Sequence, residues 1–356
     1  MKPTLTMMMC LALASLLCSC EDSTNWQTLE GGLAGQVLVL NSGSGTNSLS
    51  LCDPGRLQVQ RDVAPTALLP NHAFQQGDRL FVTCSGDDRI VSYALGDSSL
   101  EVLESWSLNA LDGRQAGELV YTPWSSLFFG GEIYTSLSAR NEISAIPETG
   151  DSLRAFATGS WPQGLCLSGD TLYVACTGFS LSTLEFGPGT VRAHRLPSGE
   201  ELWSTEVGAN PQRLALTPAG ELLVLCSGDY VLREGQLVVL DPRNGAESWN
   251  LPLGDFPGAM ALDGRDLWLA AWGQYDLQPG GTQEGHVTRV SLDQRAFDRG
   301  PENPWRVQAG ATDLCLAGGR LFVSCYAQDA LCVIQGDSLL ECLPVGHGPG
   351  ALLLLE

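Results

Sequence analysis

The sequence predicts an all-β chain that folds as a single seven-bladed β-propeller built from four-stranded antiparallel blades. Two observations predict this fold. A short apolar strand pattern recurs seven times at regular spacing, and the last residues repeat the opening of a blade that the first blade lacks. The composition agrees, because 41 glycines, 19 prolines and a hydrophobic content of 44% are typical of many short buried strands joined by turns.

The repeated strand has the form of an apolar run that ends in cysteine in its four clearest copies. Those copies are residues 80–84, 172–176, 222–226 and 321–325, and weaker copies occupy 37–41, 127–131 and 267–271. Successive copies begin 43 to 54 residues apart. This spacing is close to the roughly 40–50 residues of a four-stranded propeller blade. Seven copies therefore predict seven blades, and we interpret the run as the second strand of each.

The fifth repeat shows all four strands of a blade. Alternating apolar residues predict strands at 213–217, 221–226, 236–241 and 247–253. The sequences Pro218-Ala-Gly220 and Pro242-Arg-Asn-Gly245 predict the turns after the first and third strands. We name the four strands of a blade A to D, from the axis of the ring outward.

The two ends of the chain predict how the ring closes. The first blade begins at its B strand, in residues 36–41, and so lacks an A strand. The C-terminal segment has the Gly-x-x-Pro lead that opens other blades and then an apolar run at 352–355, after which the sequence ends. We predict that 352–355 supplies the missing strand, because an open ring would expose an unpaired edge. The propeller then spans 36–356.

Residues 1–19 form a predicted signal peptide, and residues 20–35 a lipidated cysteine with a short tether. Lys2 and the apolar run at 7–17 have the order of a secretory signal. The sequence Leu17-Cys18-Ser19-Cys20 resembles a lipobox, and Cys20 is the predicted lipidation site because the small Ser19 precedes it. A plain secretory signal cut near the same place is the alternative. No later segment has the roughly 18 uninterrupted apolar residues of a membrane helix. We expect a membrane-anchored lipoprotein of the cell envelope that faces the periplasm or the cell surface.

The charge of the chain excludes some partners. Lys and Arg number 19 against 40 Asp and Glu, which gives a net charge of −21, and the only lysine is Lys2. Coulomb repulsion makes nucleic acid and anionic lipid headgroups poor partners for such a chain. The predicted contact with a membrane is therefore through the lipid anchor alone.

The repeat resembles a known family. Blade five is similar to the YVTN repeat of bacterial surface and periplasmic propellers. The similar parts are a Gly-x-x-Pro sequence followed by Leu-x-Leu, and then residues 220–224 and 237–241. Residues 196–203 and 240–249 also resemble the Asp-x-x-x-Gly-x-x-x-Trp element of quinoprotein-like repeats. The resemblance implies the architecture and is weak on function. The family's usual Asn after strand B is Cys four times in this chain.

Nine cysteines remain beside the predicted anchor, and export would permit disulfides. Cys84, Cys176, Cys226 and Cys325 occupy equivalent places in different blades, and we expect small buried residues there. A thiolate metal site is the alternative for these four. In the last blade, a hairpin loop at 336–338 would place Gln335 opposite Leu339. That register sets Cys332 opposite Cys342 and predicts a disulfide.

Catalytic signatures are absent from the sequence. It has no His-Glu-x-x-His, Cys-x-x-Cys or Gly-x-Ser-x-Gly motif, and only four histidines, each near a loop or strand end. The A strands are mainly Leu and Ala at their centres, which disfavours a carboxylate-bound metal at the axis. We predict no enzyme activity, no metal and no cofactor.

Candidate binding residues lie in the loops of one face. The D–A and B–C loops share a face, and the B–C loops lengthen in blades three to six, at 130–141, 177–190, 227–235 and 273–285. Loops on a rigid scaffold are where binding residues concentrate. The aromatic residues of this long-loop face are Tyr134, Phe179, Phe186, Tyr230 and Tyr275 from the B–C loops, with Trp161 and Phe256 from the D–A loops. The candidates also include Asp229, Asp255, Asp276 and His347.

The favoured hypothesis is a non-catalytic binding or scaffold lipoprotein. Its partner would be an envelope protein or another neutral or basic ligand on the long-loop face, with Trp161, Phe256 and Tyr275 as energetic anchors. We expect a monomer. The alternative for the aromatic residues is that they pack the loops onto the ring. The alternative functions are an outer-membrane assembly factor and a propeller enzyme such as a lyase, lactonase or quinoprotein.

Overall fold

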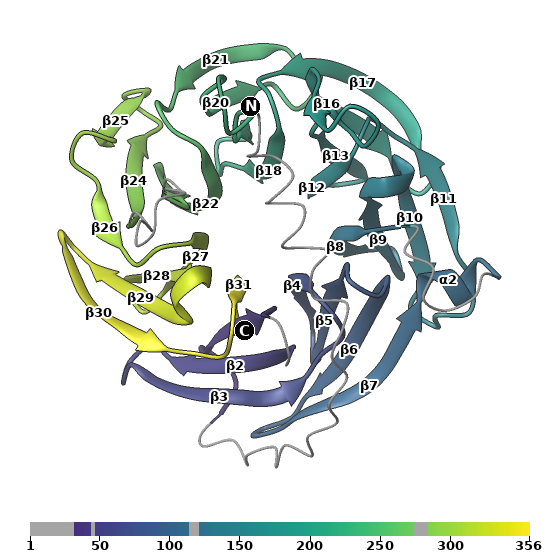
Figure 1. Ribbon diagram of the computed structural model, residues 1–356. Helices are drawn as coiled ribbons and strands as arrows, with labels where there is room; N and C mark the ends of the chain where they lie inside the picture. Colours follow the sequence, from purple (N-terminus) through teal and green to yellow (C-terminus); the bar gives the residue numbers. More distant parts are fainter. Residues whose placement is uncertain (1–31, 44–46, 114–120, 274–283) are drawn as a thin grey trace.

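The computed structural model describes residues 32–43, 47–113, 121–273 and 284–356. It confirms an all-β ring of seven four-stranded antiparallel blades (Figure 1). Blades follow one another in sequence order around a central axis, and strand A of each blade is innermost.

The first four blades have the following strands in A to D order. Blade one has β31 (Pro349–Leu354), β1 (Val37–Asn41), β2 (Ser48–Asp53) and β3 (Gln58–Pro65). Blade two has β4 (Pro70–Gln76), β5 (Arg79–Cys84), β6 (Arg89–Leu95) and β7 (Leu100–Ser107), followed by the short helix α2 (Leu108–Leu111). Blade three has β8 (Pro123–Phe129), β9 (Glu132–Leu137), β10 (Glu142–Pro147) and β11 (Arg154–Ala157). Blade four has β12 (Pro162–Ser168), β13 (Thr171–Cys176), β16 (Gly189–Arg195) and β17 (Glu200–Val207).

The last three blades repeat this order. Blade five has β18 (Pro211–Leu216), β19 (Leu222–Cys226), β20 (Gln236–Leu240) and β21 (Glu247–Pro252). Blade six has β22 (Pro257–Asp263), β23 (Asp266–Ala271) and β24 (Gly285–Ser291), with an outer strand in two pieces, β25 (Ala296–Arg299) and β26 (Trp305–Val307). Blade seven has β27 (Ala311–Ala317), β28 (Arg320–Cys325), β29 (Ala330–Gln335) and β30 (Ser338–Pro344). Two short 3-10 helices, Ser138–Arg140 and Tyr326–Gln328, follow β9 and β28.

Blade one is closed by the C-terminal strand, as the sequence predicts. β31 pairs antiparallel with β1, and Val37, Leu38 and Val39 face Leu354, Leu353 and Leu352. In Figure 1 the purple start and the yellow end of the described chain meet in this blade. The first and last strands are therefore hydrogen-bonded neighbours, which removes the open edge that a propeller would otherwise have.

The hydrophobic core is divided into seven clusters, one between each pair of adjacent blades. The four equivalent cysteines belong to these clusters. Cys84, Cys176, Cys226 and Cys325 are each buried at the end of strand B, between their own blade and the preceding one. Their thiols therefore fill space in the packing between blades.

Four blade junctions share a hydrogen bond that we call the inter-blade clasp. A B–C loop side chain accepts a hydrogen bond from the backbone N–H just before the A strand of the next blade. The four pairs are Asn47 with Leu69 (3.1 Å), Asp88 with Thr122 (2.9 Å), Asn141 with Trp161 (2.8 Å) and Asp329 with Gly348 (2.8 Å). The acceptors belong to blades one, two, three and seven. The B–C loops of these blades are short, whereas those of blades four to six are longer.

The predicted strand assignment in blade three is wrong, because the run predicted as strand B belongs to strand A. Residues 127–131 were interpreted as strand B, but the apolar part of this run ends β8, which is strand A. Gly130 and Gly131, with φ of 60° and 85°, form the A–B turn, and strand B is β9. A left-handed φ at two successive residues is readily adopted by glycine. The predicted long B–C loop at 130–141 is consequently a turn, a strand and one short 3-10 helix.

The hairpin of blade seven differs from the prediction at its turn but agrees at the cysteines. Gln335 pairs with Ser338 rather than Leu339, so the turn has two residues. A β-bulge between Val333 and Ile334 then shifts the pairing by one residue. The shift restores the predicted register farther along the hairpin, where Cys332 lies opposite Cys342. The structure joins these two cysteines by a disulfide.

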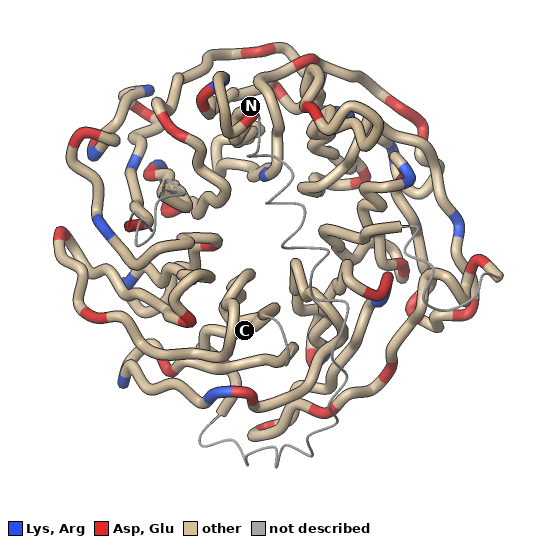
Figure 2. Tube along the Cα trace, viewed as in Figure 1, with Lys and Arg blue, Asp and Glu red and all other residues tan. Residues whose placement is uncertain are grey.

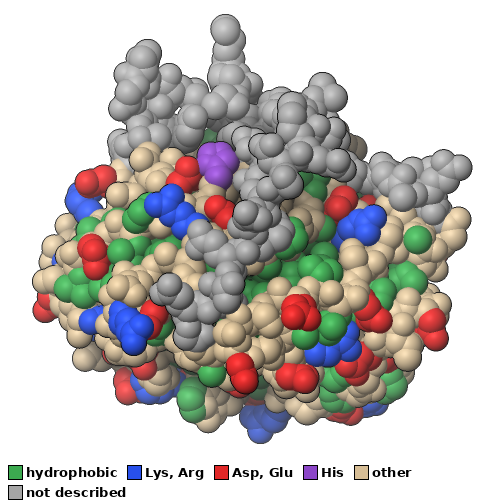
Figure 3. Space-filling view, turned by 90° about the horizontal axis from the view of Figure 1, so that it is seen from below, with side chains coloured by type: hydrophobic (Ala, Val, Ile, Leu, Met, Phe, Trp, Pro, Cys, Tyr) green, Lys and Arg blue, Asp and Glu red, His purple; other side chains and the backbone are tan. Residues whose placement is uncertain are grey.

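The surface is acidic all around the ring. Acidic residues outnumber the arginines, and both are interspersed along the chain (Figure 2). On the side of the disc in Figure 3, acidic, basic and hydrophobic side chains alternate over short distances.

Within the described ranges, no helix has both the length and the apolar character needed to cross a membrane.

Candidate functional site

The long-loop face is built mainly by the B–C loops of blades four and five. In blade four, the loop between β13 and β16 contains a small hairpin of β14 (Phe179–Ser180) and β15 (Glu185–Phe186). In blade five, the loop between β19 and β20 lies beside that hairpin, and Arg233 Nη2 donates a hydrogen bond of 2.6 Å to the carbonyl of Phe186. The candidates Tyr275 and Asp276, in blade six, lie outside the described residues.

Five aromatic rings form one continuous row across blades four, five and six. Successive ring centroids are 5.1, 5.2, 6.2 and 5.9 Å apart along the row Trp161, Phe179, Phe186, Tyr230 and Phe256. The structure thus brings together five of the aromatic residues predicted on this face. Tyr134 is not part of this row, because it lies on β9 and is fully buried.

The row serves mainly to hold the loops in place. Phe179 is only 7% exposed and packs between Trp161 and Phe186. The hydroxyl of Tyr230 accepts a hydrogen bond of 2.8 Å from Gln212 Nε2 at the start of the blade-five A strand. Rings stacked at these distances stabilise one another beyond their buried area. The row therefore acts as a floor that fixes both loops to the ring.

The exposed apolar surface of this face is aliphatic, and the sequence analysis missed it. Four side chains stand at the tips of the two loops with large exposed fractions: Leu181 (53%), Leu184 (37%), Val231 (58%) and Leu232 (85%). We call these four residues the loop-tip patch. The sequence signal for this surface is two apolar pairs, 181/184 and 231/232, inside otherwise polar loops.

Asp229 determines the shape of the blade-five tip. Its Oδ1 accepts hydrogen bonds from the backbone N–H groups of Val231 (3.0 Å), Leu232 (2.8 Å) and Arg233 (2.8 Å), and its Oδ2 pairs with Arg233 Nε at 2.9 Å. Burial raises the pKa of Asp229, but Arg233 and these N–H groups outweigh it and hold the pKa well below its usual range. The carboxylate thus keeps Val231 and Leu232 pointing outward from a fixed turn.

The other charged candidates also have partners within the protein. Asp255 forms an ion pair with His286 and accepts a hydrogen bond of 2.7 Å from the N–H of Phe256. Burial opposes ionisation of Asp255, yet His286 lowers its pKa overall. His347 pairs with Asp329 at 2.8 Å, at the junction of blades seven and one. The structure therefore places His347 away from the aromatic row. Glu185 and Glu234 are the exposed acids beside the loop-tip patch.

The axis of the ring is more polar than the sequence analysis predicted. The centres of the A strands are apolar, but their first residues include His72, Arg213 and Asp313, all partly exposed. Arg213 and Asp313 form an ion pair with 3.8 Å between Nη2 and Oδ1. Across the described part of the chain, no three His, Cys, Asp or Glu side chains gather as potential metal ligands.

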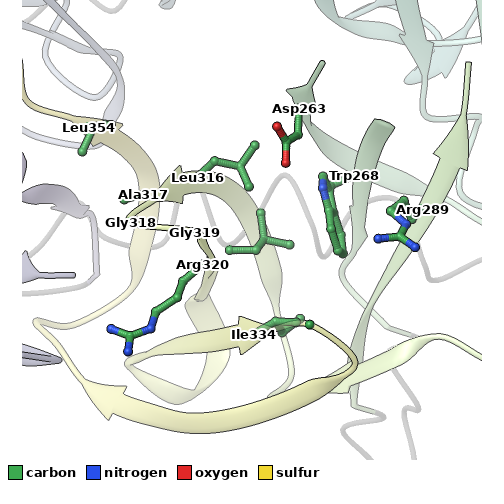
Figure 4. Close-up of a pocket in the computed structure, with 12 residues that line it drawn as sticks. Asp263, Trp268, Arg289, Leu316, Ala317, Gly318, Gly319, Arg320, Ile334 and Leu354 are labelled. Atoms are coloured by element: carbon green, nitrogen blue, oxygen red, sulfur yellow. The ribbon is translucent and has the colours of Figure 1, made fainter. Parts of the chain in front are cut away.

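A pocket of about 320 Å³ lies on the opposite face, between blades six and seven (Figure 4). Asp263, Trp268 and Arg289 line one side, and the turn at Gly318 and Gly319 lines the other. Arg289 is ion-paired with Asp298 and packs against the rings of Trp268 and Trp305. Its charge is therefore already used in packing the blade, and we assign no function to this pocket.

Comparisons with known proteins show the fold alone. No family model matches the chain, and no curated protein matches it. A 6-phosphogluconolactonase-like protein from Bacteroides fragilis is similar in structure, with a TM-score of 0.65 and 12% identity, over 94% of this chain and all of that one (100%). A second such protein, from Bacteroides uniformis, has a TM-score of 0.63 and 12% identity, over 89% of this chain and 98% of that chain.

An enzyme and a WD40 domain are also among the similar structures. The dihydro-heme d1 dehydrogenase NirN has a TM-score of 0.62 and 11% identity, over 96% of this chain and 84% of that chain. The WD40 domain of Neurospora crassa Pan2 has a TM-score of 0.56 and 11% identity, over 80% of this chain and 81% of that chain. These proteins differ widely in what they do, so the likeness supports a propeller without choosing a function.

Proposed function

We propose that the chain is a non-catalytic binding lipoprotein of the bacterial cell envelope, of the YVTN-repeat type, that docks a protein partner through its long-loop face. The loop-tip patch carries this proposal. Four aliphatic side chains with exposed fractions of 37–85% lie on two loops that contact each other. Large apolar side chains gathered on a protein surface mark interaction sites more often than scattered ones do.

The support beneath the patch strengthens the proposal. The aromatic row, the Asp229 turn and the hydrogen bond from Arg233 to Phe186 hold both loops in defined positions. A preorganised surface loses little conformational entropy when a partner binds, so more of the apolar contact appears as affinity. The exposed Glu185 and Glu234 beside the patch favour a partner with a neutral or basic rim.

The anchor is the second part of the proposal. Cys20, lipidated and made N-terminal by removal of residues 1–19, would retain the protein at a membrane, and residues 20–35 would act as a tether for the ring. We expect Cys20→Ala to leave an uncleaved precursor or to release the protein from the membrane fraction. Correct processing and full membrane retention of Cys20→Ala would contradict lipidation at this residue.

The docking surface is tested with paired variants. Leu232→Asp combined with Leu181→Asp places charges in the patch, whereas Leu103→Asp changes a similarly exposed leucine (48%) on outer strand β7. We expect a partner captured by the wild type from detergent-solubilised envelope to be lost with the double variant and retained with Leu103→Asp. The identified partner, purified, should bind the double variant at least tenfold more weakly. Equal binding to all three proteins would contradict docking at the patch.

A further inference from the structure

Three polar side chains occupy equivalent places at the inner rim of the ring. His72 in β4, Arg213 in β18 and Asp313 in β27 each stand two positions after the first residue of their A strand. The A strands are innermost and begin at the long-loop face, so these side chains lie near the ring axis, toward that face. Blade six has the small Ala259 at the same position.

Each of the three side chains is hydrogen-bonded to the A strand of the next blade. The contacts are from Ser126 N–H to His72 Nδ1 (3.3 Å), from Arg213 Nε to the Gly258 carbonyl (3.4 Å) and from Leu352 N–H to Asp313 Oδ2 (2.9 Å). These contacts use one atom of each side chain and fix its orientation. The backbone of Leu314 also contributes a hydrogen bond to Asp313, whereas Arg213 Nη2 and His72 Nε2 have no hydrogen-bond partner among the described residues.

The unused atoms include both hydrogen-bond donors and an acceptor. Arg213 Nη2 and Asp313 Oδ1 are 3.8 Å apart, which is an ion pair but too long for a hydrogen bond. His72 Nε2 has no hydrogen-bond partner among the described residues. The side chains of Arg213 and Asp313 are 27% and 14% exposed. A side-chain carbon added at Gly258, between Arg213 and Asp313, would meet no atom within 4 Å, so this stretch of the rim is open.

The protonation of His72 follows from its surroundings. Burial, assisted by the charge of Arg213, lowers the pKa of His72 to about 4, so the ring is neutral at pH 7. Because Nδ1 accepts the hydrogen bond from Ser126, the proton of the neutral ring is on Nε2. Burial raises the pKa of Asp313, and the nearby Arg213 opposes that effect. The ion pair with Arg213 favours the ionised form of Asp313, and in that form the charges of the two side chains cancel.

We propose that His72, Arg213 and Asp313 form a binding site for a small carboxylate that carries a hydroxyl or amino group next to its carboxyl group. Arg213 and His72 Nε2 donate to the carboxylate, and Asp313 accepts from the neighbouring hydroxyl or ammonium group. A simple anion would be repelled by Asp313 and a simple cation by Arg213, so a balanced site favours a ligand with both kinds of group. This site is independent of the loop-tip patch, and its failure would leave the docking proposal intact.

The test uses glycolate, glycine and acetate as probes of the purified protein at pH 7. The ring signals of histidine are followed by NMR, and the signal of His72 is identified by its absence in His72→Gln. We expect glycolate and glycine to shift this signal saturably, and acetate to bind at least tenfold more weakly. Arg213→Gln should weaken glycolate binding at least tenfold, whereas Arg243→Gln, an exposed arginine on the opposite face, should leave it unchanged.

Two results would overturn the proposal. One is the absence of any saturable shift of the His72 signal with glycolate and glycine in the wild-type protein, which decides the matter even if a variant fails to fold. The other is equal binding of acetate and glycolate, since Asp313 would then take no part in recognition. Asp313→Asn, with a melting temperature close to that of the wild type, should remove the preference for glycine over acetate.

Discussion

At the scale of single residues, acceptor side chains in the short B–C loops decide how blades are joined. Asp88 is fully buried, and its carboxylate accepts from the N–H groups of Tyr121 (3.3 Å) and Thr122 (2.9 Å) across the junction of blades two and three. Its own φ is 53°, a conformation that Asn and Asp tolerate better than other residues with side chains.

Replacement of Asp88 should separate these two effects. We expect Asp88→Ala to lower the free energy of unfolding by about 2–3 kcal/mol, because the N–H groups of Tyr121 and Thr122 and the side-chain amide of Asn109 lose their acceptor. Asp88→Asn keeps the left-handed conformation and one acceptor oxygen, so it should cost less than half as much. Urea denaturation of both variants measures the difference. A loss that is equal for Ala and Asn would show that the clasp hydrogen bond contributes little.

His72 should make stability depend on pH. Its pKa is lowered in the folded protein to about 4, whereas an unfolded histidine titrates near its ordinary value of 6.5. The unfolded state therefore binds more protons between these values, and stability that is complete above pH 6.5 is lost as pH falls toward 4. Between pH 7 and pH 5 the loss should be about 2 kcal/mol. In His72→Gln this part of the pH dependence should disappear, and an unchanged profile of unfolding free energy against pH would contradict the assignment.

The sequence could locate most candidate residues but could not assign their roles. Trp161, Phe179, Tyr230 and Phe256 were correctly placed on one face, yet their rings pack on one another beneath the exposed leucines. Whether a loop aromatic ring faces solvent or another ring depends on contacts between loops of different blades, which a linear pattern does not contain. His72, Arg213 and Asp313 were missed for the same reason, because only ring closure brings three A strands together.

At the scale of strands and hairpins, alternation and turn residues predicted most of the elements. Blade five agrees within about two residues at every strand boundary, since its strands are separated by clear Pro and Gly turns. Blade three failed because its A strand is as apolar as a typical B strand, and the two glycines at 130 and 131 fit either end of a loop. Local hydrophobicity cannot decide between adjacent strands of similar composition.

The hairpin of β29 and β30 provides a prediction at this scale. Cys332 and Cys342 lie directly opposite each other, and the bond between them closes a segment of 11 residues (sequence separation 10). We expect the disulfide in exported protein, and its reduction should cost at most about 3 kcal/mol by the chain-entropy argument. Peptide mapping without reduction should recover the two cysteines in one linked fragment. Recovery of both as free thiols would contradict the pairing.

At the scale of the whole molecule, the ring depends on its last strand. β31 contributes Leu352, Leu353 and Leu354 to the pairing with β1 and Leu355 to the core between blades one and two. Removal of residues 352–356 should expose the inner edge of β1 and cost several kcal/mol. Leu355 is buried, Leu352, Leu353 and Leu354 are half-buried, and a fully buried leucine contributes about 1.5–3 kcal/mol. Thermal unfolding of the truncated chain should show a large fall in melting temperature. An unchanged melting temperature would refute closure by this strand.

The ring also concentrates its long loops on one face. The inter-blade clasp links four junctions with short loops, whereas blades four to six have longer B–C loops, so the described projecting surface is concentrated over about half of the ring. The aromatic row takes the place of the clasp there and holds the loop-tip patch above the disc.

Site-specific photo-crosslinking in intact bacteria tests the central claim most directly. A photoreactive amino acid is placed at position 232 in the loop-tip patch, at position 103 on the outer strand of blade two, or at position 243 in a turn of the opposite face. Docking at the loop-tip patch predicts a discrete crosslinked partner from position 232 and none from position 103 or 243. Crosslinking from position 103 or 243, with none from position 232, would contradict docking at the loop-tip patch and move the docking surface elsewhere on the ring.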